Sequence, residues 1–316
     1  MPGVLHITNG DSVSLQSTGL GGEVLTWQDV LHEGPVPAGL TLEGMRPIRA
    51  EFLAKLTGRP RNDVLAGLER RDQALSRFSY HDEVILWFEH DLYDQLQLIQ
   101  ILDWFSRRPL NKTLLSLISS DRYLGPLRPE ELLPLYLTRR PTTTAQLHLA
   151  HHAWRAFCAP QPVPLASILR EDTSALPYLQ NALARHLEQF PSVQNGLSRT
   201  ERQILEISEA GASRVGEIFM ADQGREDAIF MGDIAFLFHI RGLANCRVPL
   251  LRILKEEDPF GNTKVAITAA GRSVLRGEQD HVRFNGIDRW LGGVHLEGHQ
   301  VWRWDAATRS AVAPGC

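Results

Sequence analysis

Cysteine is scarce in this sequence, which has only Cys158, Cys246 and Cys316 among its 316 residues. Three cysteines this far apart exclude a disulfide framework and a Cys-x-x-Cys metal knuckle, and they favour a reducing compartment. No apolar run reaches the ~18 residues that a membrane span needs. The N-terminus also lacks the basic and apolar segments of a signal peptide. We therefore expect a cytoplasmic protein that does not insert into a membrane.

Lysine is scarce as well, because only four of the 33 basic residues are lysine and the others are arginine. Arginine suits bidentate contacts with phosphate or carboxylate groups, although codon bias in a GC-rich genome produces the same composition. The net charge of -4 argues against a surface devoted to nucleic acid. Neither a Gly-x-Gly-x-x-Gly motif nor a P-loop motif is present, which disfavours the common dinucleotide and P-loop sites.

Short apolar runs alternate with helical patterns over residues 1–125. This alternation predicts an α/β domain with a mainly parallel open sheet flanked by helices. Five consecutive apolar residues at 84–88 predict a strand buried on both faces. The predicted strands are 4–8, 23–27, 84–88 and 114–118, and the predicted helices are 46–57, 62–77 and 92–105.

Two further parts follow this domain. Residues 126–192 are predicted to form a helical linker or subdomain, and residues 193–316 a winged-helix-like domain with a tryptophan-rich tail. Ser198 and Glu201 form a capping box that opens its first helix. Its other expected elements are helices near Ser213 and at 232–242, strands at 248–254 and 263–267 around a turn at 258–262, a helix from Thr268, and a hairpin of 294–296 with 301–304. Acidic residues outnumber basic ones over 195–281, which argues against sequence-specific DNA binding.

Polar clusters follow all four predicted strands. Because the carboxyl ends of parallel strands meet at one edge of an open sheet, we expect these clusters to share a crevice that binds a small phosphorylated or nucleotide-like ligand. The expected catalytic residues are Asp11, Ser12, His32, Glu33, Glu89, His90 and Asp91, and the expected ligand-binding residues are Asn9, Gly10, Ser120 and Asp121. Structural interpretations stand beside these roles, since Asp91 with Asp94 can cap the following helix and Asp121 can be a turn residue.

Two chemistries in this crevice use its carboxylates and histidines. The first is metal-assisted hydrolysis, in which a metal ion such as Mn, Fe or Zn activates a water molecule. The candidate metal ligands are His32, Glu89, His90 and Asp91. The second is acid–base or phosphoryl chemistry without a metal, in which backbone amides of Asn9 and Gly10 bind a phosphate.

Two alternatives do not depend on that carboxylate chemistry. The Gly10-Asp11-Ser12 segment resembles the first block of the GDS-type (SGNH) serine hydrolases, which carry an Asp-x-x-His motif late in the domain. Here the motif near the site runs from Asp29 to His32, directly after the second strand, and so departs from that order. The other alternative is a non-enzymatic regulator that contacts DNA or a protein through the winged helix.

Three longer motifs lie in the first 125 residues, at 5–12 (LHITNGDS), 27–35 (WQDVLHEGP) and 86–96 (LWFEHDLYDQL). They resemble the bacterial family catalogued as domain of unknown function 1835. Residues 198–202 (SRTER) and 288–293 (DRWLGG) resemble the C-terminal part of the same proteins. The resemblance implies that the polar clusters at the strand ends are a signature of the family. Such a signature can form a binding site or stabilise the fold, and the resemblance implies no reaction.

The segment 286–295 has two interpretations of its own. In the first, the tail docks on another domain through its large tryptophan side chains. In the second, the side chains of Asp288, Arg289 and His295 lie close to the crevice or to a partner.

Overall fold

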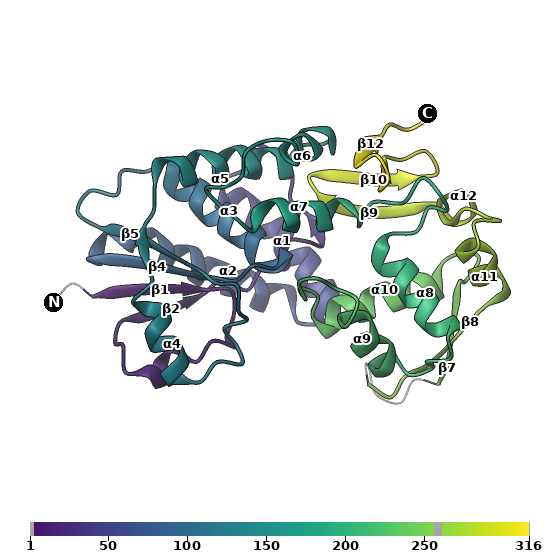
Figure 1. The fold of residues 1–316 in the computed structure, drawn as a ribbon, viewed down its shortest axis with the longest axis horizontal. Helices are drawn as coiled ribbons and strands as arrows, with labels where there is room; N and C mark the ends of the chain where they lie inside the picture. The colour runs from purple at the N-terminus through teal and green to yellow at the C-terminus, as the bar shows by residue number, and fades with distance from the viewer. Residues whose placement is uncertain (1–2, 256–260, 316) are drawn as a thin grey trace.

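The computed structural model describes residues 3–255 and 261–315. Its N-terminal part is built on a five-stranded sheet with the strand order β2-β1-β4-β5-β6 (Figure 1). Neighbouring strands are parallel except β6, which runs antiparallel to β5. The strands are β1 (Val4–Thr8), β2 (Glu23–Thr26), β4 (Glu83–Phe88), β5 (Leu114–Ser119) and β6 (Arg140–Pro141). The prediction of an α/β fold with a mainly parallel sheet is confirmed, and the short edge strand β6 is the addition to it.

Helical segments cover both faces of this sheet. Val84, Leu86 and Phe88 of β4 pack into the larger core, whereas Ile85 and Trp87 pack into the smaller core on the opposite face. All five side chains are 0% exposed, which confirms a strand buried on both faces. The larger core lies under α1 (Leu42–Thr57), α2 (Arg61–Ser76), η2 (Phe78–Tyr80) and α3 (Leu92–Ser106), and the smaller one under η1 (Leu15–Thr18) and α4 (Pro129–Tyr136).

The chain leaves the neighbouring strands β1 and β4 in opposite directions. From β1 it crosses the η1 face to reach β2, and from β4 it crosses the α3 face to reach β5 on the other side of the sheet. The loops after the two strands therefore part from each other. In open α/β sheets, the crevice left at such a switch point is where ligands bind.

The middle of the chain is helical, as predicted, and packs on the α/β part. Its helices are α5 (Thr144–Phe157), α6 (Val163–Ile168) and α7 (Leu179–Leu187). Both α5 and α7 contact α3, so α3 is covered on its outer side. This explains why α3 is buried on nearly all sides, including polar residues such as Gln97 and Gln100.

The C-terminal part begins with α8 and the expected capping box. Ser198 accepts a hydrogen bond from the Glu201 N–H at 3.1 Å, and the Glu201 carboxylate accepts one from the Ser198 N–H at 2.8 Å. Arg214, rather than Ser213, occupies the N-cap of the next helix. The elements are α8 (Arg199–Glu209), α9 (Val215–Gln223), α10 (Asp233–Asn245), the antiparallel pair β7 (Leu251–Lys255) and β8 (Lys264–Ile267), α11 (Ala269–Leu275) and α12 (His281–Asn285). Residues 258–260 of the predicted turn lie outside the described residues.

The tail forms two hairpins, so the predicted pairing of 294–296 with 301–304 is wrong. β9 (Ile287–Gly292) pairs with β10 (Val294–Gly298), and β11 (Arg303–Asp305) pairs with β12 (Ser310–Val312). The cause is the two-residue turn at Gly292 and Gly293, where Gly292 has a φ of 59° that favours glycine.

The β9–β10 hairpin docks on the N-terminal part of the chain. β9 runs parallel to β3 (Gly34–Pro35), with Gly34 opposite Leu291 and Pro35 opposite Gly292. Two sequence motifs about 250 residues apart, WQDVLHEGP and DRWLGG, therefore pair with each other. Over the part of the chain that is described, no helix is both long and apolar enough to cross a bilayer.

Candidate functional site

Three carboxylates meet at the switch point between β1 and β4. Glu89 directly follows β4, Asp91 is the N-cap of α3, and Asp94 lies in the first turn of α3. One oxygen of each lies within 4.8 Å of one oxygen of the others, and all three residues are buried. We call Glu89, Asp91 and Asp94 the carboxylate cluster. The capping role of Asp91 is confirmed, since it accepts a hydrogen bond from the Asp94 N–H at 3.1 Å.

Donors from three strand ends hold the carboxylate cluster. Asp94 accepts from the Glu89 N–H at 2.7 Å and from Nδ2 of Asn9, which follows β1, at 2.6 Å. Glu89 Oε1 accepts from the N–H of Leu124, in the loop after β5, at 2.7 Å. The ends of β1, β4 and β5 therefore converge, as the polar clusters in the sequence predict.

Burial controls the protonation of these carboxyl groups. Desolvation raises the pKa of Asp91 to about 7, and the charge of Glu89 adds to the shift. Desolvation also raises the pKa of Glu89, and it raises that of Asp94 well above its usual range. No arginine, lysine or histidine of the described residues forms an ion pair with the cluster. Its charge must therefore be compensated by bound protons or by a cation.

Asn9 gives an independent indication of a ligand at the carboxylate cluster. The residue is 8% exposed, and while Nδ2 donates to Asp94, the buried Oδ1 has no hydrogen-bond partner. Leaving a buried acceptor unpaired costs about 1–3 kcal/mol. One amide oxygen beside three carboxylates is a donor set typical of Mg²⁺, Mn²⁺ or Ca²⁺ rather than of Zn²⁺.

The other candidates near β4 and β5 have different surroundings. The His90 ring lies 4.9 Å from the Tyr123 ring and 5.9 Å from the Tyr178 ring, measured between centroids. Asp121 is exposed. Ser120 is buried, and its hydroxyl donates at 2.8 Å to a carbonyl two residues on, so it stabilises the local turn.

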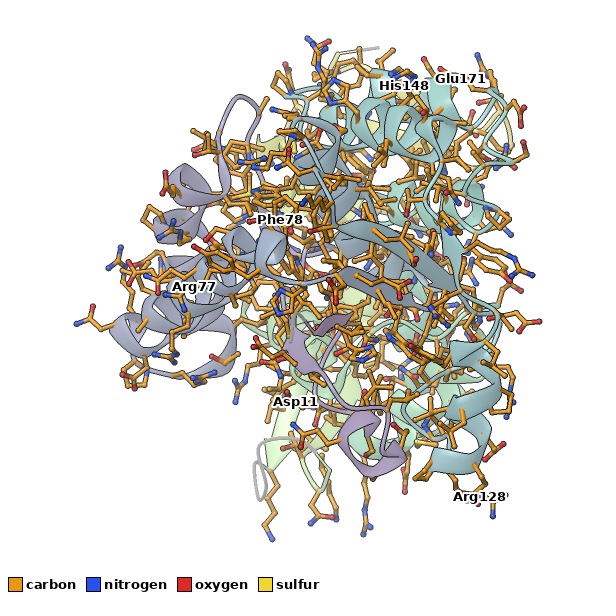
Figure 2. All side chains as sticks on the ribbon, turned by 90° about the vertical axis from the view of Figure 1, so that its left-hand side faces the viewer. Asp11, Arg77, Phe78, Arg128, His148 and Glu171 are labelled. Atoms are coloured by element: carbon orange, nitrogen blue, oxygen red, sulfur yellow. The ribbon has the colours of Figure 1, made fainter. Side chains whose placement is uncertain are left out.

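The residues after β1 flank the crevice. Asp11 lies at the surface, where its carboxylate accepts a hydrogen bond from Gln28 (Figure 2). Ser12 is also exposed, and its side chain lies against Gly125. The Gly10 carbonyl accepts from the Thr8 hydroxyl at 3.1 Å. Of the four candidates at this strand end, Asn9 is the one that reaches the carboxylate cluster.

Asp29 anchors the loop after β2. Its Oδ1 accepts from Nε and Nη2 of the buried Arg49 at 3.0 and 2.7 Å, and Arg71 approaches its Oδ2 at 3.7 Å. Both ring nitrogens of His32 lack a hydrogen-bond partner. The hydrogen-bonded chain from Ser12 through His32 to Asp29 that a serine hydrolase needs is not assembled.

His32 and Glu33 belong to a second buried group that joins the α/β part to the C-terminal part. Glu33 Oε1 lies 2.7 Å from Nε2 of His239 on α10. The charges of His32 and Glu33 contribute to the pKa of His186 on α7. Each of the four is at most 2% exposed. We call His32, Glu33, His186 and His239 the buried histidine cluster. His186, like His32, has no hydrogen-bond partner at either ring nitrogen.

The buried histidine cluster predicts a loss of stability in acid. Desolvation lowers the pKa of His32 to about 4 and that of His186 to about 3. An unfolded chain binds protons at both positions near pH 6.5, so the free energy of unfolding falls as the pH falls from about 6.5 toward those values. Each buried imidazole should contribute up to about 1.4 kcal/mol per pH unit in that window.

Urea denaturation between pH 4.5 and 7 measures this effect. His186→Gln should have a visibly shallower pH dependence than the wild type, whereas His148→Gln, at an exposed position, should leave it unchanged. Equal slopes for the wild type and His186→Gln would contradict the assignment.

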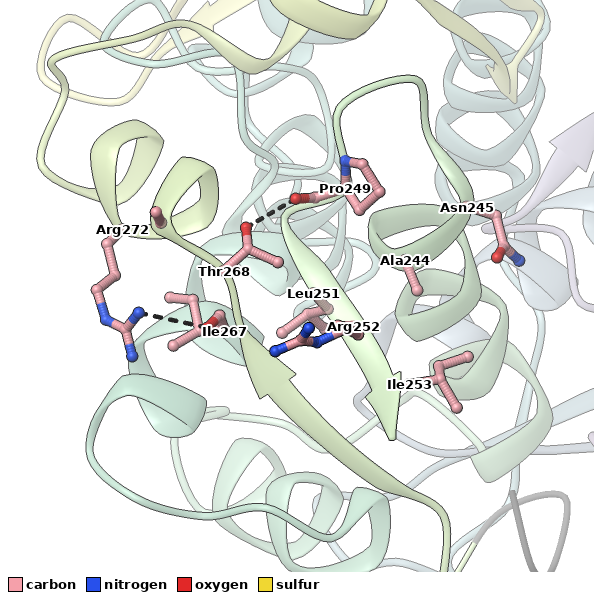
Figure 3. A pocket seen from close by; sticks show the side chains of 10 residues that line it. Ala244, Asn245, Pro249, Leu251, Arg252, Ile253, Ile267, Thr268 and Arg272 are labelled. Carbon is pink, nitrogen blue, oxygen red and sulfur yellow. Dashed lines mark hydrogen bonds between the residues drawn. The ribbon is translucent and has the colours of Figure 1, made fainter. Parts of the chain in front are cut away.

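A separate hollow of about 660 Å³ lies in the C-terminal part, between α10, β7 and β8 (Figure 3). The Thr268 hydroxyl donates to the Pro249 carbonyl at its edge, at 2.7 Å. Its lining includes Arg252 and Arg272 but no carboxylate or imidazole. It therefore offers no carboxylate or imidazole for acid–base chemistry.

The candidate list omits three residues that the fold brings to these clusters. Asp94 appears in the sequence only as part of a helix cap, although its spacing of three from Asp91 also places both on one side of the first helical turn. His186 and His239 come from helices far along the chain and carry no local signal.

Comparison with known proteins adds no assignment to this geometry. No family model and no curated protein matches the chain. The resemblance of the three N-terminal motifs to the bacterial family therefore stays a prediction.

Proposed function

We propose that this protein is a divalent-cation-dependent enzyme that hydrolyses or transfers a phosphoryl group at the switch point of its sheet. The observation that carries the proposal is the carboxylate cluster, three buried acids without a basic partner among the described residues. The unpartnered Oδ1 of Asn9 beside them supports it independently. A hard cation would compensate the buried charge and use these oxygens as ligands.

This assignment changes the expected ligand set. Glu89 and Asp91 remain, Asp94 and Asn9 join them, and the ring of His90 lies among tyrosines instead. A bound cation would neutralise a phosphate and lower the pKa of a coordinated water. Because carboxylate and amide oxygens suit Mg²⁺ and Mn²⁺, we expect these ions to bind at the carboxylate cluster.

Calorimetric titration of the pure protein with Mg²⁺, Mn²⁺, Ca²⁺ and Zn²⁺ tests the proposal first. We expect saturable binding of Mg²⁺ or Mn²⁺ with one ion per chain. Release of inorganic phosphate from a panel of nucleotides and sugar phosphates, with and without the bound ion, then tests the reaction. A protein that binds none of the ions at millimolar concentration does not have this function.

The alternative is a regulator that uses the C-terminal part to bind DNA. The helix order α8–α9–α10 before the β7–β8 pair, with Arg214 bridged to Lys264, is consistent with a winged helix. However, α10, the helix that would read DNA, contacts α1 and binds Glu33 through His239. Filter binding to DNA of random sequence at two salt concentrations tests this alternative. Binding that falls steeply with salt supports the regulator, and no binding at low salt removes its DNA-binding form.

A further inference from the structure

A pocket of about 300 Å³ opens beside the carboxylate cluster. His90 and Leu92, which line it, flank Asp91 in the sequence, so the segment that carries Asp91 forms part of the pocket wall. The other walls come from distant parts of the chain. They are Tyr178, Asn181, Ala182, Ala184, Arg185 and Glu188 at α7, Arg199 on α8, and Glu226, Asp227 and Ala228 in the loop between α9 and α10.

The loop between α9 and α10 is held against the strand ends by specific contacts. The Ile229 N–H donates to the Tyr123 hydroxyl at 2.5 Å. Glu226 accepts two hydrogen bonds from Arg185, at 2.8 and 2.7 Å. The Phe230 ring lies edge-on to the His32 ring at 5.1 Å. The C-terminal part of the chain therefore completes a pocket at the edge of the N-terminal sheet.

One wall of the pocket carries aromatic rings. His90 lies between Tyr123 and Tyr178, with ring centroids 4.9 and 5.9 Å away. Tyr178 is half-buried, so part of its ring stays available to a ligand. His90 Nδ1 and Arg185 Nη1 are buried without hydrogen-bond partners, although both residues line the pocket. Such a wall suits a planar, hydrogen-bonding ring.

The charges of the pocket oppose a free anion. Arg185 is paired with Glu226, Arg199 is paired with Glu188, and Asp227 adds a further negative charge. Asp91 of the carboxylate cluster lies in sequence between His90 and Leu92, which line this pocket. A phosphate can therefore approach only together with a cation that offsets these carboxylates.

We propose that this pocket binds a nucleoside monophosphate as its divalent-cation complex, with the base against Tyr178 and His90 and the phosphate toward the carboxylate cluster. The inference rests on the proposed function, because it needs the cation there. A volume of about 300 Å³ lies at the small end of ligand sites and suits one nucleotide rather than a dinucleotide.

Calorimetry with Mn²⁺ alone, and then with AMP, GMP, CMP, UMP, ribose 5-phosphate or adenosine, tests this inference. We expect the best nucleotide to bind in Mn²⁺ about tenfold more tightly than ribose 5-phosphate, because stacking of the base is lost in the latter. Removing Mn²⁺ with EDTA should weaken nucleotide binding at least tenfold.

The matched variants are Tyr178→Ala and Tyr80→Ala, the second at a position 75% exposed and outside the pocket. Tyr178→Ala should reduce the nucleotide affinity to that of ribose 5-phosphate while Mn²⁺ binding stays unchanged, and Tyr80→Ala should change neither. Normal Mn²⁺ binding with equal affinities for nucleotide and ribose 5-phosphate would overturn the inference and leave the proposed function standing. Absence of binding of Mn²⁺, Mg²⁺, Ca²⁺ and Zn²⁺ alike would overturn both.

Discussion

Glu89→Gln should make the cation-free protein more stable and abolish its response to Mg²⁺ or Mn²⁺. The amide keeps Oε1 as the acceptor for the Leu124 N–H, and its nitrogen supplies a donor toward Asp91, with which Glu89 already interacts. It also removes one of three buried carboxyl groups, and the charge of Glu89 is among the causes that raise the pKa values of Asp91 and Asp94. We expect a gain of about 0.5–2 kcal/mol in the free energy of unfolding.

The same substitution removes a carboxylate from the expected ligand set. In the wild type, a cation at 100 times its Kd should raise the free energy of unfolding by about 2.7 kcal/mol, and in Glu89→Gln this gain should disappear. Urea denaturation with and without the ion measures both effects. Asp121→Asn, an exposed carboxylate at the same edge of the sheet, should retain the full response. A variant that is less stable without the ion, yet still stabilised by it, would contradict the assignment.

Gly293→Ala should cause the largest loss of stability. A Cβ at this position would lie 1.8 Å from the Cys158 carbonyl oxygen and 2.2 Å from its carbon. Both atoms are backbone, so the β9–β10 hairpin would have to move away from the end of α5, breaking the hydrogen bond from Gly293 N–H to the Phe157 carbonyl. We expect a loss of more than about 4 kcal/mol, which is the range of severe steric changes in a core.

Gly242→Ala is the matched control for this glycine. It lies within α10, where an added Cβ meets no atom within 4 Å. Because alanine is the better helix former, the control should be about 0.5–1 kcal/mol more stable than the wild type. Chemical denaturation of both variants, or protease resistance if Gly293→Ala does not purify, gives the comparison. Equal denaturation midpoints for Gly293→Ala and the wild type would refute the steric argument.

The strand-end clusters illustrate how far a sequence pattern reaches into a site. Asn9, Glu89 and Asp91 do meet at one place, because parallel strands bring their carboxyl ends to one edge. His90 and Asp11 also follow parallel strands, so the same argument predicted that they belong to this site. Successive residues of a loop point in different directions, and only packing decides that His90 faces Tyr123 while Asp11 binds Gln28.

The role of the loop after β2 could not be predicted from the sequence, for a different reason. Its polar residues are as numerous as those of the other strand ends, yet Asp29 is held by Arg49, and Glu33 reaches His239 on α10. These partners lie 20 and 206 residues away along the chain. The motif therefore joins two parts of the molecule, and no local pattern distinguishes that role from catalysis.

The sequence by itself determined the features that depend on neighbouring residues. The buried strand β4, the caps at Ser198 and Asp91, and the alternation that leads to a parallel sheet all follow from short-range patterns of apolar and capping residues. The tertiary structure alone decided which of these residues form a site. Asp94 turns toward Asn9, the loop between α9 and α10 closes the pocket, and β9 pairs with β3. The physical reason is that each of these contacts joins segments at least 41 residues apart, whose meeting depends on the packing of the whole chain.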